Sequence, residues 1–138
     1  AGDDEDIKKA GKNMFTTLDK VFSWLLVLGG ILHGAGTFKA YDPGSSAFVW
    51  SIAGSFTAIL LATLNLMRVN RERDVMLARV CLVGCLCWVV IALMFNRSIG
   101  DMLDPRGLWH AVVAVVLAWF SFQSIMKAPI GPSLRGGR

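Results

Sequence analysis

Charged side chains are absent from the middle of every long apolar stretch in this 138-residue chain. Proton-coupled pumps and transporters usually carry a buried carboxylate within the membrane, because that group marks the proton pathway. The chain also shows no arrangement of residues typical of a catalytic site. These absences argue against a proton-coupled transporter and predict that the chain is not an enzyme by itself, with participation in a redox complex left open.

Cysteine is scarce, and its spacing is uninformative for metal binding. The three cysteines are Cys81, Cys85 and Cys87, in a C-x3-C-x-C pattern that matches neither a redox C-x-x-C motif nor a zinc ribbon. Cys81 and Cys85 share one helix face, where a thiol packs as a small apolar side chain. We therefore expect packing, with redox or metal chemistry as the alternative.

The basic charge is not gathered on an aqueous face. The formal net charge is +4, but the charged residues lie outside the apolar stretches, so no nucleic-acid partner is expected. The first residues, AGDDED, lack the basic and apolar segments of a signal peptide, and none is expected there.

Long apolar stretches dominate what is present. Hydrophobic residues make up 54% of the chain and the mean hydropathy is +0.54, above the usual range for a soluble domain. A stretch of about 20 apolar residues is long enough to cross the hydrocarbon core of a bilayer as a helix. The sequence predicts four such crossings, at residues 18–38, 46–67, 75–95 and 105–127. The predicted fold is an all-α integral membrane protein, an antiparallel bundle of four transmembrane helices.

Two flanking segments complete the predicted organisation. Residues 1–17 combine an acidic start with an amphipathic pattern, which predicts a short interfacial helix lying on the lipid headgroups. The alternative is a straight extension of the first crossing. Residues 128–138 are basic and rich in proline and glycine, so an irregular tail is expected.

Lysine and arginine are distributed unequally between the two ends of the predicted bundle. Eleven of the fourteen lie at the termini or around the turn at 68–74, and only Lys39, Arg97 and Arg106 lie at the other end. The positive-inside rule then places both termini and that turn on the cytoplasmic side. We expect the plasma (inner) membrane, or an inner membrane of an organelle.

Each predicted crossing has one face of small residues, which allows close helix packing. Four such faces would converge inside a bundle and leave larger apolar side chains toward membrane lipids. The residues of these faces are Gly29, Gly30, Gly34, Ser51, Gly54, Ala58, Ala62, Cys81, Gly84, Cys85, Ala111, Ala114 and Ala118.

The only two histidines are the candidate cofactor ligands. His33 lies about five residues before the end of the first crossing and His110 about five residues after the start of the fourth, which places both at one depth in the outer leaflet. Two imidazoles on facing helices are the ligands of a b-type haem. A quinone, a lipid headgroup or structural hydrogen bonding are the alternatives. Beside His110 we expect a polar cluster in the outer loop, formed by Arg97, Asp101, Asp104 and Arg106.

Three functions follow from these patterns. The leading hypothesis is a non-catalytic accessory or structural subunit, packed in a larger membrane complex or a homo-oligomer by its small-residue faces. The alternative is a small electron-transfer subunit that binds haem b or a quinone through His33 and His110. The third is a component of an oligomeric channel or transporter.

Overall fold

The protein is a bundle of four helices. The computed structural model describes residues 2–71 and 74–127, and the predicted irregular tail at 128–138 lies outside them. The helices are α1 (Gly2–Ala40), α2 (Ser46–Asn70), α3 (Val75–Ser98) and α4 (Pro105–Met126), with no strand among the described residues. All four are long and apolar enough to cross a membrane. The prediction of an all-α chain with four candidate spans is confirmed.

The starts of three helices follow from capping side chains. Ser45 Oγ accepts a hydrogen bond from the Phe48 amide at 3.2 Å, and Asp74 accepts one from the Leu77 amide at 2.9 Å. Asp104 caps α4, and the helix begins at Pro105. Such caps satisfy amide groups that lack a partner in the first helical turn. The ends of α2 and α3 lie three residues beyond the predicted 67 and 95, because helical hydrogen bonding continues into polar sequence.

The predicted boundary between an interfacial helix and the first crossing is not a break in the structure. Helix α1 runs unbroken for 39 residues, so its first half is a straight extension of the second. No proline occurs between Gly2 and Ala40 to interrupt it, and Gly11 in its first half does not bend the chain into a separate helix. The amphipathic pattern alone could not distinguish these two arrangements.

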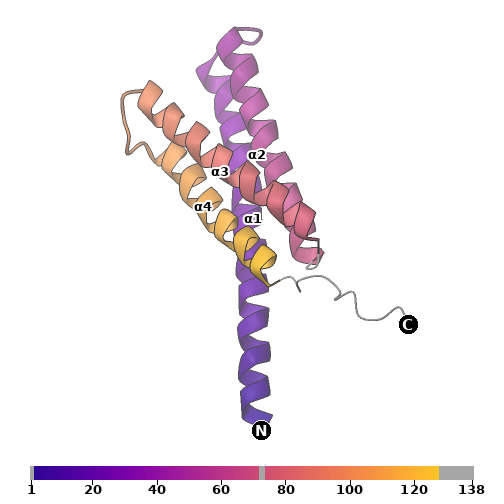
Figure 1. Ribbon diagram of the computed structural model, residues 1–138. Coiled ribbons are helices and arrows are strands. Elements are labelled where there is room, and N and C mark those ends of the chain that lie inside the picture. Colours follow the sequence, from indigo (N-terminus) through magenta and orange to yellow (C-terminus); the bar gives the residue numbers. More distant parts are fainter. Residues whose placement is uncertain (1, 72–73, 128–138) are drawn as a thin grey trace, which may run out of the picture.

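The bundle consists of two helix pairs (Figure 1). Helix α1 lies along α2, α3 lies along α4, and the pairs meet where α1 contacts α4 and α2 contacts α3. Loops 41–45 and 99–104 lie at one end, which we call the loop end. The α2–α3 turn lies at the other end, which we call the basic end, and there the first part of α1 projects past the other helices.

The core is built mainly from small side chains. All thirteen residues of the predicted small-residue faces are buried or half-buried. A side chain at Gly30 would place its Cβ 2.8 Å from Ile59 Cγ1, and one at Gly84 would lie 2.8 Å from Leu61 Cδ1. Glycine at these two positions therefore allows the close contacts of α1 with α2 and of α3 with α2.

Candidate functional site

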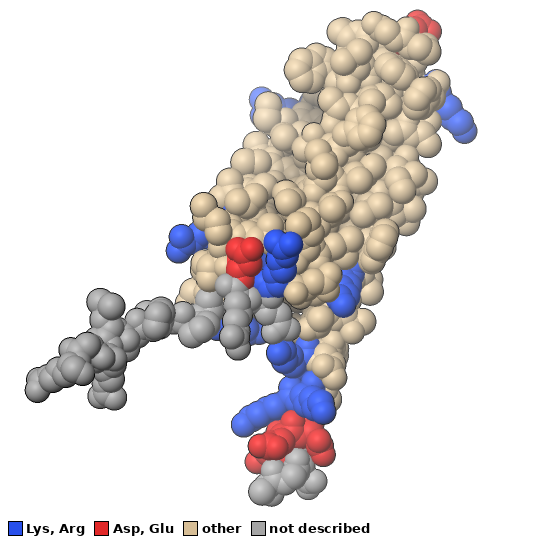
Figure 2. Space-filling model, turned by 90° about the vertical axis from the view of Figure 1, so that its right-hand side faces the viewer, with Lys and Arg blue, Asp and Glu red and all other residues tan. Residues whose placement is uncertain are grey.

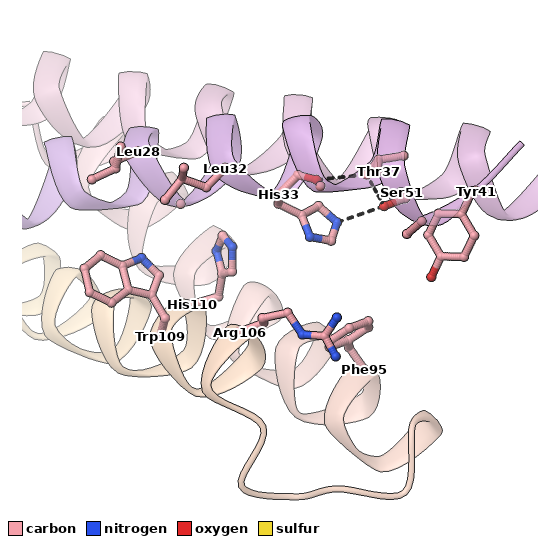
Figure 3. A pocket seen from close by; sticks show the side chains of 13 residues that line it. Leu28, Leu32, His33, Thr37, Tyr41, Ser51, Phe95, Arg106, Trp109 and His110 are labelled. Carbon is pink, nitrogen blue, oxygen red and sulfur yellow. Dashed lines mark hydrogen bonds between the residues drawn. The ribbon is translucent and has the colours of Figure 1, made fainter. Parts of the chain in front are cut away.

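A pocket at the loop end contains both histidines. Its volume is about 300 Å³, and α1 and α4 form its two main walls (Figure 3). The ring centroids of His33 and His110 lie 6.1 Å apart, with the ring planes at 82°. The fold thus brings together the two imidazoles that sequence position places at one depth. Their role as cofactor ligands stays a prediction.

Glycine at position 29 brings α4 close enough for this contact. A Cβ at Gly29 would lie 2.9 Å from Trp109 Nε1 and 3.0 Å from His110 Cε1. A larger residue at this position of α1 would push both side chains away. The packing of α1 on α4 and the closeness of the two imidazoles therefore depend on the same residue.

The hydrogen-bond network assigns the proton of His33. When Thr37 Oγ1 donates its single hydrogen to the His33 carbonyl, 2.9 Å away, the 2.6 Å bond between Thr37 Oγ1 and Ser51 Oγ uses the hydrogen of Ser51. Ser51 Oγ must then accept from His33 Nε2, 3.1 Å away. His33 Nδ1 is left as an acceptor, and no described group bonds to it (Figure 3).

A similar argument assigns the proton of His110. The indole Nε1 of Trp88 lies 3.4 Å from His110 Nδ1, and an indole nitrogen can only donate. His110 Nδ1 is therefore the acceptor, and a neutral His110 carries its hydrogen on Nε2. Trp88 is buried in the core, so this contact ties the orientation of His110 to the packing of α3 on α4.

The rest of the pocket combines apolar walls with two hydrogen-bond donors. Leu28 and Leu32 line one side and are exposed on the surface of the bundle. The guanidinium of Arg106 and the hydroxyl of Tyr41 line the opening at the loop end. The Arg106 guanidinium also lies 5.6 Å from the centroid of the Phe95 ring. The pocket therefore offers one imidazole acceptor, an apolar exit and, at its opening, Arg106 and Tyr41 as donors.

The outer-loop cluster is organised by Asp104. Its carboxylate accepts bonds from Arg106 Nε at 2.9 Å and Nη2 at 2.8 Å, and the hydrogen bonds from Arg106 lower the pKa of Asp104 below its usual range. Asp101 instead accepts a bond from the Leu103 amide at 2.9 Å. A pair of Arg97 with Asp101 would need a helical loop, and α3 ends at Ser98. Arg106 is thus held at the pocket opening.

Asn96 shapes the same loop from inside. Its Nδ2 donates to the carbonyls of Met102 at 3.1 Å and Asp104 at 3.2 Å. Its Oδ1 is buried without a hydrogen-bond partner and faces Gly107, where a Cβ would overlap it. Asn96 therefore holds the loop that carries Asp104 and Arg106 to the pocket.

A second polar site lies inside the bundle near the basic end. Arg68 Nη2 donates to Asp19 Oδ1 at 2.7 Å, and both side chains are buried. Arg68 also donates to Asn65 Oδ1 and, at 2.9 Å, to Ser124 Oγ. Ser121 Oγ lies 3.3 Å from the same Asn65 oxygen. This network joins α1, α2 and α4 through one guanidinium.

Sequence reasoning missed the Asp19–Arg68 pair. Each residue lies at the edge of an apolar stretch, where a charge is usually taken as a headgroup or solvent contact. The available signal was that the two opposite charges lie at the same end of neighbouring helices. Helix α2 continues to Asn70, which keeps Arg68 inside the bundle rather than in the turn.

In the part of the chain that the structure describes, the cysteines are not grouped with other candidate metal ligands. Cys81 and Cys85 are buried, Cys87 is exposed, and all three are free. Cys85 Sγ lies 3.5 Å from Asn65 Nδ2 and so joins the polar network at the basic end. Within residues 2–71 and 74–127, no three His, Cys, Asp or Glu side chains are grouped so that they could hold a metal ion.

The fold and its two polar sites define a small four-helix bundle with four candidate membrane spans, a histidine pocket at one end and a buried ion pair near the other. Comparison with family models, with curated proteins and with solved structures finds no match for this chain. A functional assignment therefore depends on the geometry of the sites.

Proposed function

We propose that the protein crosses a membrane four times as an antiparallel bundle, with the basic end in the cytoplasm. The lengths and apolar character of the helices support the crossings. Figure 2 shows lysine and arginine gathered toward the end from which α1 projects, below a broad surface without charge. That asymmetry supports the orientation through the positive-inside rule. The histidine pocket then lies in the outer leaflet.

Within this bundle, the pocket binds the head ring of a lipid-soluble quinol. The observation that carries this proposal is the unpaired Nδ1 of His33, which the Thr37–Ser51 chain keeps as an acceptor. A quinol hydroxyl donates to such a nitrogen, and the opposite oxygen of the ring accepts from Arg106 or Tyr41. The isoprenoid tail leaves across Leu28 and Leu32, which are exposed where lipid would be.

Such a protein is an accessory subunit rather than an enzyme by itself. It holds the quinol, and a partner membrane subunit oxidises that quinol. From the small-residue faces, the sequence predicts assembly with other subunits. In the structure the residues of these faces are packed inside the bundle. Partner contacts would instead use the outer faces, where large residues such as Trp50 and Phe56 are 76% and 63% exposed.

Ligation of a b-type haem by His33 and His110 is the second candidate. Two imidazoles on one metal have ring centroids about 6 Å apart, because each metal–nitrogen bond is about 2 Å. The observed separation is 6.1 Å, which favours this candidate. The pocket volume of about 300 Å³ lies at the lower end of ligand pockets, which span about 300–1,000 Å³. That size suits a single ring better than a porphyrin.

Quenching of tryptophan fluorescence tests the quinol proposal, because Trp109 lines the pocket. The purified protein in mild detergent is titrated with a decyl-substituted benzoquinol kept in its reduced form. His33→Ala should weaken binding about tenfold, since it removes one hydrogen bond and leaves the ligand hydroxyl unpaired. Unchanged affinity in His33→Ala would contradict the proposal.

Two serines of α2 provide a matched control. Ser51→Ala removes the group that sets the proton of His33 and should weaken binding. Ser55, one turn away, donates only to the Ser51 carbonyl at 3.2 Å, so Ser55→Ala should bind as the unchanged protein does. An absorption spectrum of the same samples separates the second candidate. A Soret band that disappears in both His33→Ala and His110→Ala would establish haem instead.

A further inference from the structure

A larger cavity opens at the basic end, away from the histidine pocket. Its volume is about 840 Å³, and it lies between the first half of α1 and the last turns of α4. Lys8 and Lys127 both line it, and Phe15, Trp119 and Phe120 form an apolar wall. One site thus places two cations from different helices beside aromatic rings.

The charges of this cavity are unbalanced. The acidic group in its wall is Asp19, which is already bonded to Arg68 at 2.7 Å. Lys127 Nζ lies 5.6 Å from the centroid of the Phe15 ring, and both Lys8 and Lys127 are exposed. A cationic opening of this kind is complementary to a phosphate, because the described residues that line the wall include no second acid beside Lys8 and Lys127.

The wall identifies which phosphate compound fits. A free phosphate ion would make no favourable contact with the exposed rings of Phe15 and Trp119. A phospholipid places its phosphate among the lysines and its acyl chains along aromatic side chains, and basic pockets on the cytoplasmic side bind anionic headgroups. The site lies where α1 projects past the end of α4 (Figure 1), at the height expected for headgroups.

We propose that this cavity is a binding site for an anionic phospholipid of the cytoplasmic leaflet. Lys8 and Lys127 contact the phosphate, and Trp119 and Phe120 contact the upper part of an acyl chain. The proposal rests on the membrane location proposed above, but it is independent of the ligand of the histidine pocket.

The test uses brominated lipids, which quench a tryptophan only at short range. The full chain is reconstituted in phosphatidylcholine vesicles containing increasing fractions of brominated phosphatidylglycerol or brominated phosphatidylcholine. Comparison with Trp119→Phe isolates the signal of Trp119. Brominated phosphatidylglycerol should quench it at about a tenfold lower mole fraction than brominated phosphatidylcholine.

Charge-matched variants decide whether the site causes this preference. The double variant Lys8→Gln with Lys127→Gln should abolish the preference for phosphatidylglycerol. The control Lys39→Gln with Arg97→Gln removes equal charge at the loop end and should preserve this preference. Equal quenching by the two lipids in the unchanged protein would overturn the proposal. So would loss of the preference in millimolar inorganic phosphate, which would assign the site to a free anion.

One further outcome separates this proposal from the membrane location on which it rests. If neither brominated lipid quenches any tryptophan, the chain does not contact the bilayer, and the location and the lipid site fail together. If both lipids quench equally, only the lipid site fails. The benzoquinol titration in detergent reports on the histidine pocket in either case.

Discussion

The proton positions in the histidine pocket are set by three ordinary side chains. Thr37, with one hydrogen to donate, determines the direction of the bond to Ser51, and Ser51 in turn determines which nitrogen of His33 is protonated. Trp88 does the same for His110. The polar neighbours thus determine which nitrogen of each neutral imidazole accepts a hydrogen bond. These neighbours are separated from the histidines by up to 22 residues in the chain.

At the residue scale, Gly107 should be intolerant of substitution. In Gly107→Ala, the new Cβ would overlap Asn96 Oδ1 and lie 3.0 Å from the Ala92 carbonyl. We expect a loss of about 1–3 kcal/mol in the free energy of unfolding, the usual cost of forcing extra volume into a packed site. Thermal unfolding in detergent measures it.

Gly36→Ala is the control for this prediction. A Cβ at Gly36 meets nothing within 4 Å, and alanine favours a helix over glycine by up to about 1 kcal/mol. The Tm of Gly36→Ala should stay equal or rise. If Gly107→Ala were as stable as Gly36→Ala, the close contact between Asn96 and α4 would not exist in the protein.

At the scale of helices, the Asp19–Arg68 network connects elements that small-residue packing alone would leave free to slide. Arg68 bonds to side chains of α1, α2 and α4. A buried ion pair is weak evidence of net stability, but leaving one partner alone is costly. The network therefore fixes the relative positions of three helices near the basic end.

A double-mutant cycle tests this role. Arg68→Ala alone should lower the free energy of unfolding by about 3–5 kcal/mol, because it leaves a buried carboxylate unpaired. Asp19→Ala should lower the free energy of unfolding by a similar amount, because it leaves the buried guanidinium of Arg68 without its carboxylate. The double variant should lose less than the sum of the two single variants, as expected for groups in direct contact. Additive losses in thermal unfolding would show that the two side chains do not interact.

At the scale of the whole molecule, the proposed orientation predicts which ends are accessible from outside the cell. In a chain whose three cysteines are replaced by alanine, single cysteines are introduced at the exposed positions Asp42, Ser98, Lys9 and Asn70. A membrane-impermeant maleimide should label positions 42 and 98 in intact cells. Positions 9 and 70 should react only after permeabilisation. The reverse pattern would contradict the positive-inside assignment.

The sequence by itself determined the four helices and much of their burial. Apolar stretches of sufficient length and small residues at helical spacing are local properties, so they can be read from adjacent positions. The start of α4 at Asp104–Pro105 was predictable for the same reason, since a cap acts within one turn.

Only the tertiary structure decided how polar groups from distant positions meet. The pairing of Asp19 with Arg68 is hidden by their separation of 49 positions in the chain. The continuity of α1 through residue 17 depends on the whole helix rather than on its amphipathic first half. Helix geometry alone predicts a common depth for His33 and His110. Their 6.1 Å separation required the contact of α1 with α4 at Gly29, because the rotation of each helix about its axis is set by packing against its neighbours.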